Sequence, residues 1–211
     1  MQVLIAANEQ QTLEIKDKNT RSESNLVFVK RISDVKNYEL FDAIFLLTND
    51  ISSGTFKEFP GKPVFINSVI ETLAQLNLPF NYSRVNGWPG FLQRPVWEVA
   101  TNDDKAAKII FEELGWDVLF VKDEPGLISP RVISMIVNEA YFALAEEVST
   151  KDEIDLAMKL GTNYPFGPFE WQNKIGIKNI YELLKKLSET DRRYLVSPEL
   201  ERNFKESSKI Y

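Results

Sequence analysis

The stretch Asp-Glu-Pro-Gly-Leu-Ile-Ser-Pro-Arg at residues 123–131 divides this chain into two parts of different character. Pro125 and Gly126 are typical of a turn, whereas Ser129 is a good helix N-cap and Pro130 suits the first helical position. Short apolar runs dominate before this stretch, and only helix-type patterns follow it. We therefore expect two domains, one over residues 1–122 and one over residues 123–211.

The first part reads as an α/β domain. Its apolar runs have the length and the β-branched content of buried strands. A helix is expected over residues 103–114, with a cap at Thr101-Asn102 and an end at Gly115. Strands that alternate with helices predict a mostly parallel sheet. The expected strand runs are residues 3–7, 25–29, 41–47, 63–66 and 118–121.

The second part reads as all-α. A long helix should start at Ser129 and run toward Val148. Thr150 and Glu153 have the spacing of a capping box for the next helix, which Gly161 should end. Further helices are expected from residue 169, over residues 179–187 and after Ser197-Pro198.

Composition excludes several classes of function. The 211 residues include no histidine and no cysteine, and the net charge is −6. A disulfide, a thiolate nucleophile and a zinc site are therefore not expected. No cluster of Lys and Arg suggests nucleic-acid binding, and no apolar run approaches the length of a membrane span. Residues 1–7 do not resemble a signal peptide, so we expect a cytoplasmic protein with no membrane partner.

Several spaced blocks in the second part resemble the helical domain of the 3-hydroxyacyl-CoA dehydrogenase family. They are residues 123–131, 138–140, 155–161, 162–171 and 194–200, in the family's order. The resemblance implies a fold class: a reduced Rossmann-like, mostly parallel sheet followed by an all-α helical domain. It also implies an oxidoreductase of fatty acid metabolism that uses NAD and pairs through its helical domain.

The family's catalytic histidine is missing from this chain. Residues 84–99 resemble the family strand and loop that carry the histidine and its partner glutamate, but the loop is shorter. Glu98 matches the glutamate, whereas the position of the histidine falls near Trp88 or Pro89. Glu98 could be a relic of the acid-base pair, or a solvated carboxylate at a strand end.

Two further positions bear on the family's substrate site. Ser68, in the segment 65–68, would take the place of a substrate-contacting hydroxyl, although a serine there could simply cap the next helix. Pro130 stands where the family has an asparagine, which removes a side chain able to hydrogen-bond substrate. Glu98 and Ser68 are therefore the candidate catalytic residues.

The nucleotide-binding pattern is also absent. A dinucleotide site needs glycines after the first strand, so that the backbone can approach the pyrophosphate at a helix N-terminus. Here the strand is followed by Asn8-Glu9-Gln10-Gln11, and the first glycine of the chain is Gly54. Glu9 would place a negative charge where the phosphate should lie. The segment before the second strand looks too short for the usual helix, and we expect no cofactor.

Taken together, the residues indicate a dehydrogenase-like pseudoenzyme without NAD-dependent activity. One alternative is a weak or altered acyl-CoA enzyme with Glu98 as the base, which would need burial to raise its pKa. Another is an interaction protein that pairs through the helical domain. We expect a homodimer, because a small helical domain this rich in apolar residues should leave some of them exposed. An acyl-CoA is the ligand that the resemblance suggests.

Overall fold

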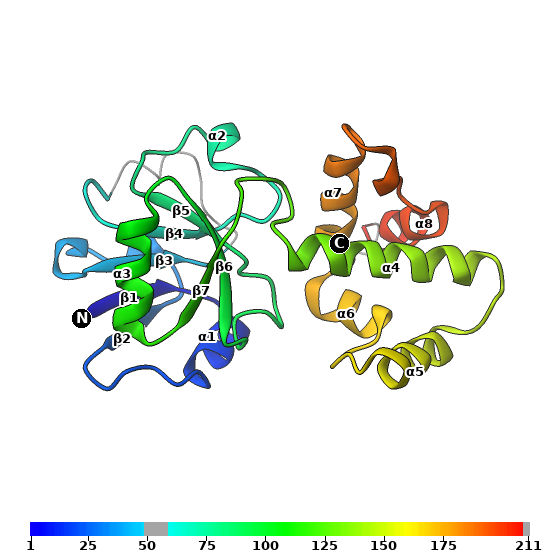
Figure 1. Ribbon diagram of the computed structural model, residues 1–211, viewed down its shortest axis with the longest axis horizontal. Coiled ribbons are helices and arrows are strands. Elements are labelled where there is room, and N and C mark those ends of the chain that lie inside the picture. The colour runs from blue at the N-terminus through cyan, green and yellow to red at the C-terminus, as the bar shows by residue number, and fades with distance from the viewer. Residues whose placement is uncertain (49–58, 209–211) are drawn as a thin grey trace. The chain divides into compact units, whose positions relative to one another are not determined.

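The computed structural model describes residues 1–48 and 59–208 and divides the chain into two compact units, Met1–Leu127 and Ile128–Tyr211. The first unit contains a β-sheet with helices, and the second contains helices (Figure 1). The division lies a few residues beyond position 122, because Asp123 and Glu124 are hydrogen-bonded to Arg84 of the first unit. In the described ranges, no helix has both the length and the apolar character to cross a lipid bilayer.

The described part of the first unit forms one seven-stranded sheet in the order β2-β1-β3-β4-β5-β6-β7. Neighbouring strands are parallel except β5 and β6, which are antiparallel. Strand β1 has β2 on one side and β3 on the other, so the order of the strands reverses there. The strands are β1 Gln2–Ala6, β2 Asn25–Val29, β3 Ala43–Leu46, β4 Val64–Asn67, β5 Tyr82–Val85, β6 Val96–Thr101 and β7 Asp117–Phe120.

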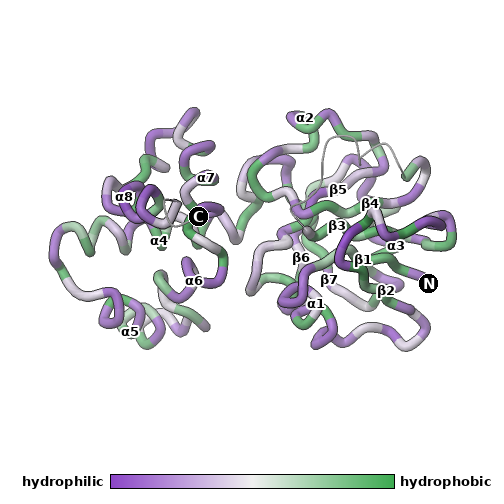
Figure 2. The backbone as a smooth tube through the Cα atoms, turned by 180° about the vertical axis from the view of Figure 1, so that it is seen from behind, coloured by the Kyte–Doolittle hydropathy of each residue, from purple (hydrophilic) through white to green (hydrophobic). Residues whose placement is uncertain are grey.

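Both faces of the sheet are covered by apolar side chains. Helices α1 (Glu9–Lys16) and α3 (Asp104–Leu114) contribute Ile15 and Phe111 to the core on one face. Leu73 of the short helix α2 (Leu73–Leu76) contributes to the core on the other face, beside the 3-10 turns η1 (Ile32–Asp34) and η2 (Tyr38–Leu40). Figure 2 shows hydrophobic colouring gathered on the central strands. Burial on both faces explains why these strands read as continuous apolar runs.

The five predicted strand runs are confirmed, with the run at 25–29 matched residue for residue. The segment between the first two strands was expected to be too short for the usual helix. Helix α1 occupies that segment, but with only 8 residues. No glycine-rich turn precedes this helix. Instead, Asn8 and Gln11 form a capping box at its N-terminus. The predicted helix 103–114 is present as α3, and its cap is Asp103 rather than Thr101-Asn102.

The second unit contains five described α-helices and one 3-10 turn. They are α4 Ser129–Ala145, α5 Lys151–Thr162, α6 Pro168–Ile175, α7 Ile177–Ser188, η4 Arg192–Tyr194 and α8 Pro198–Ser207. Helix α4 packs against α6, α7 and α8. Asn138 of α4 bonds to the backbone of Leu195 and Ser197, and so holds the turn that precedes α8.

Helix boundaries in this unit follow most of the predicted signals. The capping box of Thr150 and Glu153 is confirmed. Gly161 does not end α5; the helix continues to Thr162, and Asn163 adopts the left-handed conformation that ends it. Ser129 lies inside α4 rather than capping it. The N-terminus of α6 is held by Asp155, whose carboxylate accepts from the N–H groups of Phe169 and Glu170 at 2.7 and 3.1 Å.

Candidate functional site

The sheet topology locates the crevice in which a ligand would bind. In open α/β sheets, ligands bind outside the carboxyl ends of the strands, at the point where the strand order reverses. Here that point lies between β1 and β3, next to the N-terminus of α1. Three features of this crevice decide what it can hold: the N–H groups of α1, the side chain of Gln11 and the loop from β5 to β6.

Two backbone N–H groups at the N-terminus of α1 already have hydrogen-bond partners. The side chain of Asn8 accepts from the backbone N–H of Gln11 at 2.9 Å. In return, the side chain of Gln11 accepts from the backbone N–H of Asn8 at 3.0 Å. A phosphate at a helix N-terminus needs such N–H groups free and pointing toward it. This capping box therefore occupies donors that a pyrophosphate would require.

The amide of Gln11 also fills the crevice itself. Only 3% of Gln11 is exposed, and its Nε2 donates to the carbonyls of Leu47 at 2.8 Å and Gly87 at 3.0 Å. Asn67 completes the network, because it donates to the same Leu47 carbonyl and accepts from the N–H of Gly87. The carboxyl ends of β3, β4 and β5 are thus joined to α1 through side-chain amides.

A side chain of α1 also binds the loop between β5 and β6. Glu14 is buried, and its carboxylate accepts from the N–H groups of Gly90 at 2.8 Å and Leu92 at 3.2 Å. Trp88, one of the two positions where the histidine would fall, is 4% exposed. Neither Trp88 nor the neighbouring Pro89 can exchange a proton near neutral pH. The carboxylate of Glu14 therefore stabilises a loop that has no acid or base at the expected position.

The structure places Glu98 within β6 rather than at the end of a strand. The neighbouring side chains of Trp97 and Val99 belong to the core that α1 and α3 cover. Since successive side chains of a strand point to opposite faces, the half-buried Glu98 lies on the other face. Its partner on β7 is Leu119.

Ser68 follows β4, so β5 separates its strand from the strand of Glu98. The hydroxyl of Ser68 donates to the carbonyl of Glu71 at 2.8 Å. The cap of α2 is Thr72, so the hydroxyl of Ser68 is engaged in a local turn rather than in capping that helix.

Arg84 is a residue that the sequence analysis did not single out. Its side chain is fully buried, forms an ion pair with Asp123 and donates to the carbonyls of Ser68 and Glu124. Burial lowers the pKa of Arg84, and the charge of Asp123 acts in the opposite direction. Asp123 also accepts from the N–H groups of Leu73 and Ala74 at the start of α2. A charged residue in a short strand that is otherwise uncharged was the available signal.

A mostly apolar pocket of about 430 Å³ opens beside the crevice, where β1 and β2 end. Leu13 and Phe28 form part of its wall, and Glu9 and Lys30 form an ion pair at 2.9 Å beside it. This hydrogen bond and the charge of Lys30 lower the pKa of Glu9. A dinucleotide site has an acid near the end of the second strand. Here the basic residue Lys30 follows β2, and the acidic residue Glu9 lies on α1.

Metal chemistry has no support in the described residues, where no group of three or more acidic side chains could hold an ion. The chain has no histidine or cysteine to add to such a group.

Comparison with known proteins gives different results for the two units. The family model of the 3-hydroxyacyl-CoA dehydrogenase C-terminal domain matches residues 126–209. The 3-hydroxyadipyl-CoA dehydrogenase of Escherichia coli K12 is 42% identical over 91 residues, which cover 42% of this chain and 19% of that protein. The 3-hydroxybutyryl-CoA dehydrogenase of Bradyrhizobium diazoefficiens is 35% identical over 104 residues, which cover 47% of this chain and 36% of that protein.

The fold comparison extends over both units. The crystal structure of (S)-3-hydroxybutyryl-CoA dehydrogenase from Ralstonia eutropha covers 95% of this chain and 92% of its own, with a TM-score of 0.69 and 16% identity. At that identity the match concerns the fold alone, which is a Rossmann-like sheet followed by a helical domain. The helical unit therefore matches the C-terminal domain of the 3-hydroxyacyl-CoA dehydrogenase family, and the chain spans about a third or less of the length of the curated relatives named above.

Proposed function

We propose that this chain is a 3-hydroxyacyl-CoA dehydrogenase-like protein without NAD-dependent dehydrogenase activity. The observation that carries the proposal is the position of Gln11, which is buried and bonded to the carbonyls of Leu47 and Gly87 in the crevice. A pyrophosphate would have to displace this side chain and break the capping box of α1. It would also meet the negative charge of Glu9 in the first turn of α1.

The proposal has independent support from acid-base chemistry. Hydride transfer to a 3-oxoacyl group needs an acid that protonates the developing alkoxide, and a family histidine would supply it. The chain has no histidine at any position. Loss of a general acid typically costs about 10²–10⁴-fold in rate. The missing histidine and the Gln11 side chain in the crevice therefore both argue against NAD-dependent dehydrogenase activity.

A thermal-shift screen with NAD, NADH and acetoacetyl-CoA, followed by a turnover assay, tests the proposal. A ligand that binds only the native state raises apparent stability by mass action. We expect no shift with NAD or NADH, a shift with acetoacetyl-CoA, and no detectable oxidation of NADH. A turnover of roughly 10 per second, which is the median for enzymes, would contradict the proposal.

The same assay addresses an acyl-CoA enzyme that uses Glu98 as its base. Any weak turnover of acetoacetyl-CoA should then disappear in Glu98→Gln. Turnover that persists in Glu98→Gln would assign the activity to another residue.

We also propose that the chain forms a homodimer through its helical unit. Leu156 and Leu160 lie one turn apart on α5 and are 54% and 78% exposed, and Val148 just before α5 is 67% exposed. Large exposed apolar surface usually marks a partner surface, and a two-fold contact between identical chains is the commonest arrangement. A cytoplasmic location remains a prediction from the sequence.

Light scattering at micromolar concentration tests the dimer and should give about twice the chain mass of 24.3 kDa. Leu160→Glu should shift the protein toward the monomer. Leu40→Glu is the matched control, because Leu40 is 70% exposed but lies in the first unit. A wild-type monomer, or equal behaviour of the two variants, would refute the proposed interface.

A further inference from the structure

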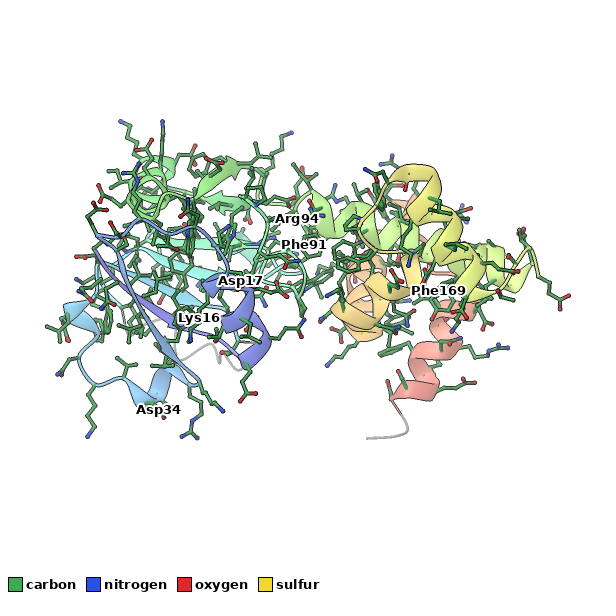
Figure 3. The ribbon with its side chains drawn as sticks, turned by 90° about the horizontal axis from the view of Figure 1, so that it is seen from below. Lys16, Asp17, Asp34, Phe91, Arg94 and Phe169 are labelled. Carbon is green, nitrogen blue, oxygen red and sulfur yellow. The ribbon has the colours of Figure 1, made fainter. Side chains whose placement is uncertain are left out.

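Lys18 lies immediately beyond α1, outside the crevice, and forms part of a pocket of about 240 Å³. The walls come from three segments: residues 17–19 after α1, Gln93 and Pro95 in the loop before β6, and residues 115–117 from the end of α3 to the start of β7. Figure 3 labels Asp17 at the end of α1 and Arg94 on that loop. The amine of Lys18 joins the two segments by donating to the carbonyl of Arg94.

The amine of Lys18 lies near two indole rings. Its nitrogen is 5.3 Å from the ring centre of Trp116 and 5.6 Å from that of Trp97. Lys18 is half-buried, so its amine is partly withdrawn from water but remains within reach of a molecule in solution.

Burial and the neighbouring charges shift the pKa of the amine in opposite directions. Burial lowers the pKa of Lys18 to about 8, whereas the carboxylate of Asp117 raises it. The indole faces also favour the ammonium form. Asp17 lines the same pocket, and the guanidinium of Arg94 lies over the ring of Phe91, 4.7 Å from its centre. The net effect is a lysine with a substantial free-amine fraction in mildly alkaline solution.

We propose that Lys18 is the preferred acylation site of this chain, with an acyl-CoA thioester as the acyl donor and the pocket as the place that receives the acyl group. The lone pair of Nζ attacks the thioester carbonyl, a C–N bond forms and the C–S bond breaks. CoA leaves as the thiolate, and the proton released from the nitrogen is taken up by the thiolate or by water. The step needs no oxidant or reductant. It requires acyl-CoA in solution and does not depend on the proposed function.

The pocket accommodates acylated Lys18 as well as the free amine. An acylated lysine keeps one N–H group, which can still donate to the carbonyl of Arg94. It loses the positive charge that burial disfavours. The acyl group would lie against Pro95 and Trp116, both of which line the pocket. Acylation therefore replaces a partly desolvated charge by a neutral amide without removing the hydrogen bond between the two segments.

The test measures acetylation of every lysine by peptide mass spectrometry after the full chain is incubated with acetyl-CoA at pH 8. Lys62 is the matched control, because it is also half-buried and donates to a backbone carbonyl, that of Glu39 at 3.0 Å. At this pH a group with a pKa of about 8 is roughly half free amine, against about 0.4% for an ordinary lysine. An amine of lower pKa is also a weaker nucleophile, which offsets part of this gain. Lys18 should still react at least about tenfold faster than Lys62.

Unfolding provides the second arm of the test. In concentrated urea the pocket is lost, so the ratio of the two rates should fall to about one. In folded Lys18→Arg, the acetylation rates of the remaining lysines should stay unchanged. Equal rates for Lys18 and Lys62 in the folded chain would overturn the proposal. A preference that persists in urea would overturn it too, because it would then come from the local sequence and not from the pocket.

Discussion

The first unit keeps the fold of its relatives, whereas the helical unit keeps their sequence as well. A family model matches residues 126–209, while similarity to the Ralstonia eutropha structure extends over 95% of the chain at 16% identity. The fold of the first unit depends on apolar strands such as β1 and β3, whose described interior is fully buried. Nucleotide binding depends on a few groups at the strand ends, and there Gln11, Asn67 and Glu14 tie the segments to one another.

Helix N-termini in both units are held by side chains, some from distant and some from adjacent positions in the chain. In the helical unit, Asp155 of α5 reaches across to the N-terminus of α6. In the first unit, Asn8 caps α1 from the adjacent position in the chain. Both solutions satisfy N–H groups that would otherwise be unpaired. The cap on α1 does so at the place where a dinucleotide-binding fold keeps such groups for phosphate.

The largest expected effect is in the first unit, at the ion pair of Arg84 and Asp123. Arg84→Ala leaves the carboxylate of Asp123 without its buried partner and opens a cavity between β5 and the connection to the second unit. Breaking a buried pair by removing one partner costs about 3–5 kcal/mol. Urea unfolding should show this loss. Arg31→Ala, which breaks an exposed pair with Asp34, should change stability little, and similar losses in both variants would contradict the role of burial.

The next effect concerns the crevice. Gln11→Ala removes the amide that bonds to Leu47 and Gly87 and leaves their buried carbonyls with fewer partners. Leaving buried polar groups unsatisfied typically costs about 1–3 kcal/mol. Gln10→Ala is the control, since Gln10 is exposed and adjacent. The midpoint of thermal denaturation should be lower for Gln11→Ala than for Gln10→Ala. Equal midpoints would mean that the hydrogen bonds of Gln11 do not stabilise the fold.

In the helical unit, Asp155→Ala should lower stability by about 1–2 kcal/mol, because it removes the cap of α6. Asp155→Asn, which keeps an acceptor, should lose less. The amide exchange rates of Phe169 and Glu170 would report the loss locally. Exchange that remains slow at both positions in Asp155→Ala would show that the carboxylate does not protect them.

The smallest expected effect is a pH dependence in the first unit. The pKa of Lys18 is lowered to about 8 by burial, against about 10.4 for a lysine in an unfolded chain. Between these values the unfolded state binds more protons, so the free energy of unfolding should rise with pH. Because the group is half-exposed, we expect a rise of no more than about 1 kcal/mol. Lys18→Arg, which stays charged, should lack it; identical pH profiles for wild type and variant would contradict the shift.

The sequence predicts local structure better than it predicts contacts between residues that are far apart in the chain. The strand at 25–29 and the capping box of Thr150 and Glu153 depend on neighbouring residues, and both were predicted correctly. Gln11 could not be identified, because its partners are backbone carbonyls of residues 36 and 76 positions away. Backbone carbonyls leave no signal in a sequence.

The same limit applies to the candidate site. The absence of histidine and of early glycines could be read directly from the sequence. The capping box that closes the start of α1 could have been recognised from Asn8 and Gln11, which have the required spacing. Arg84 could not be assigned its partner, because Asp123 lies 39 positions away. Glu98 and Ser68 remain candidate residues, one within β6 and the other just after β4, and β5 lies between these two strands.

Calorimetric titration of NADH into the chain of 211 residues tests the central claim most directly. The claim is that the capping box and the amide of Gln11 close the crevice to a dinucleotide. We expect no binding heat at NADH concentrations up to the millimolar range, for wild type and for the Gln10→Ala control alike. A dissociation constant in the micromolar range for the wild-type chain would contradict the account.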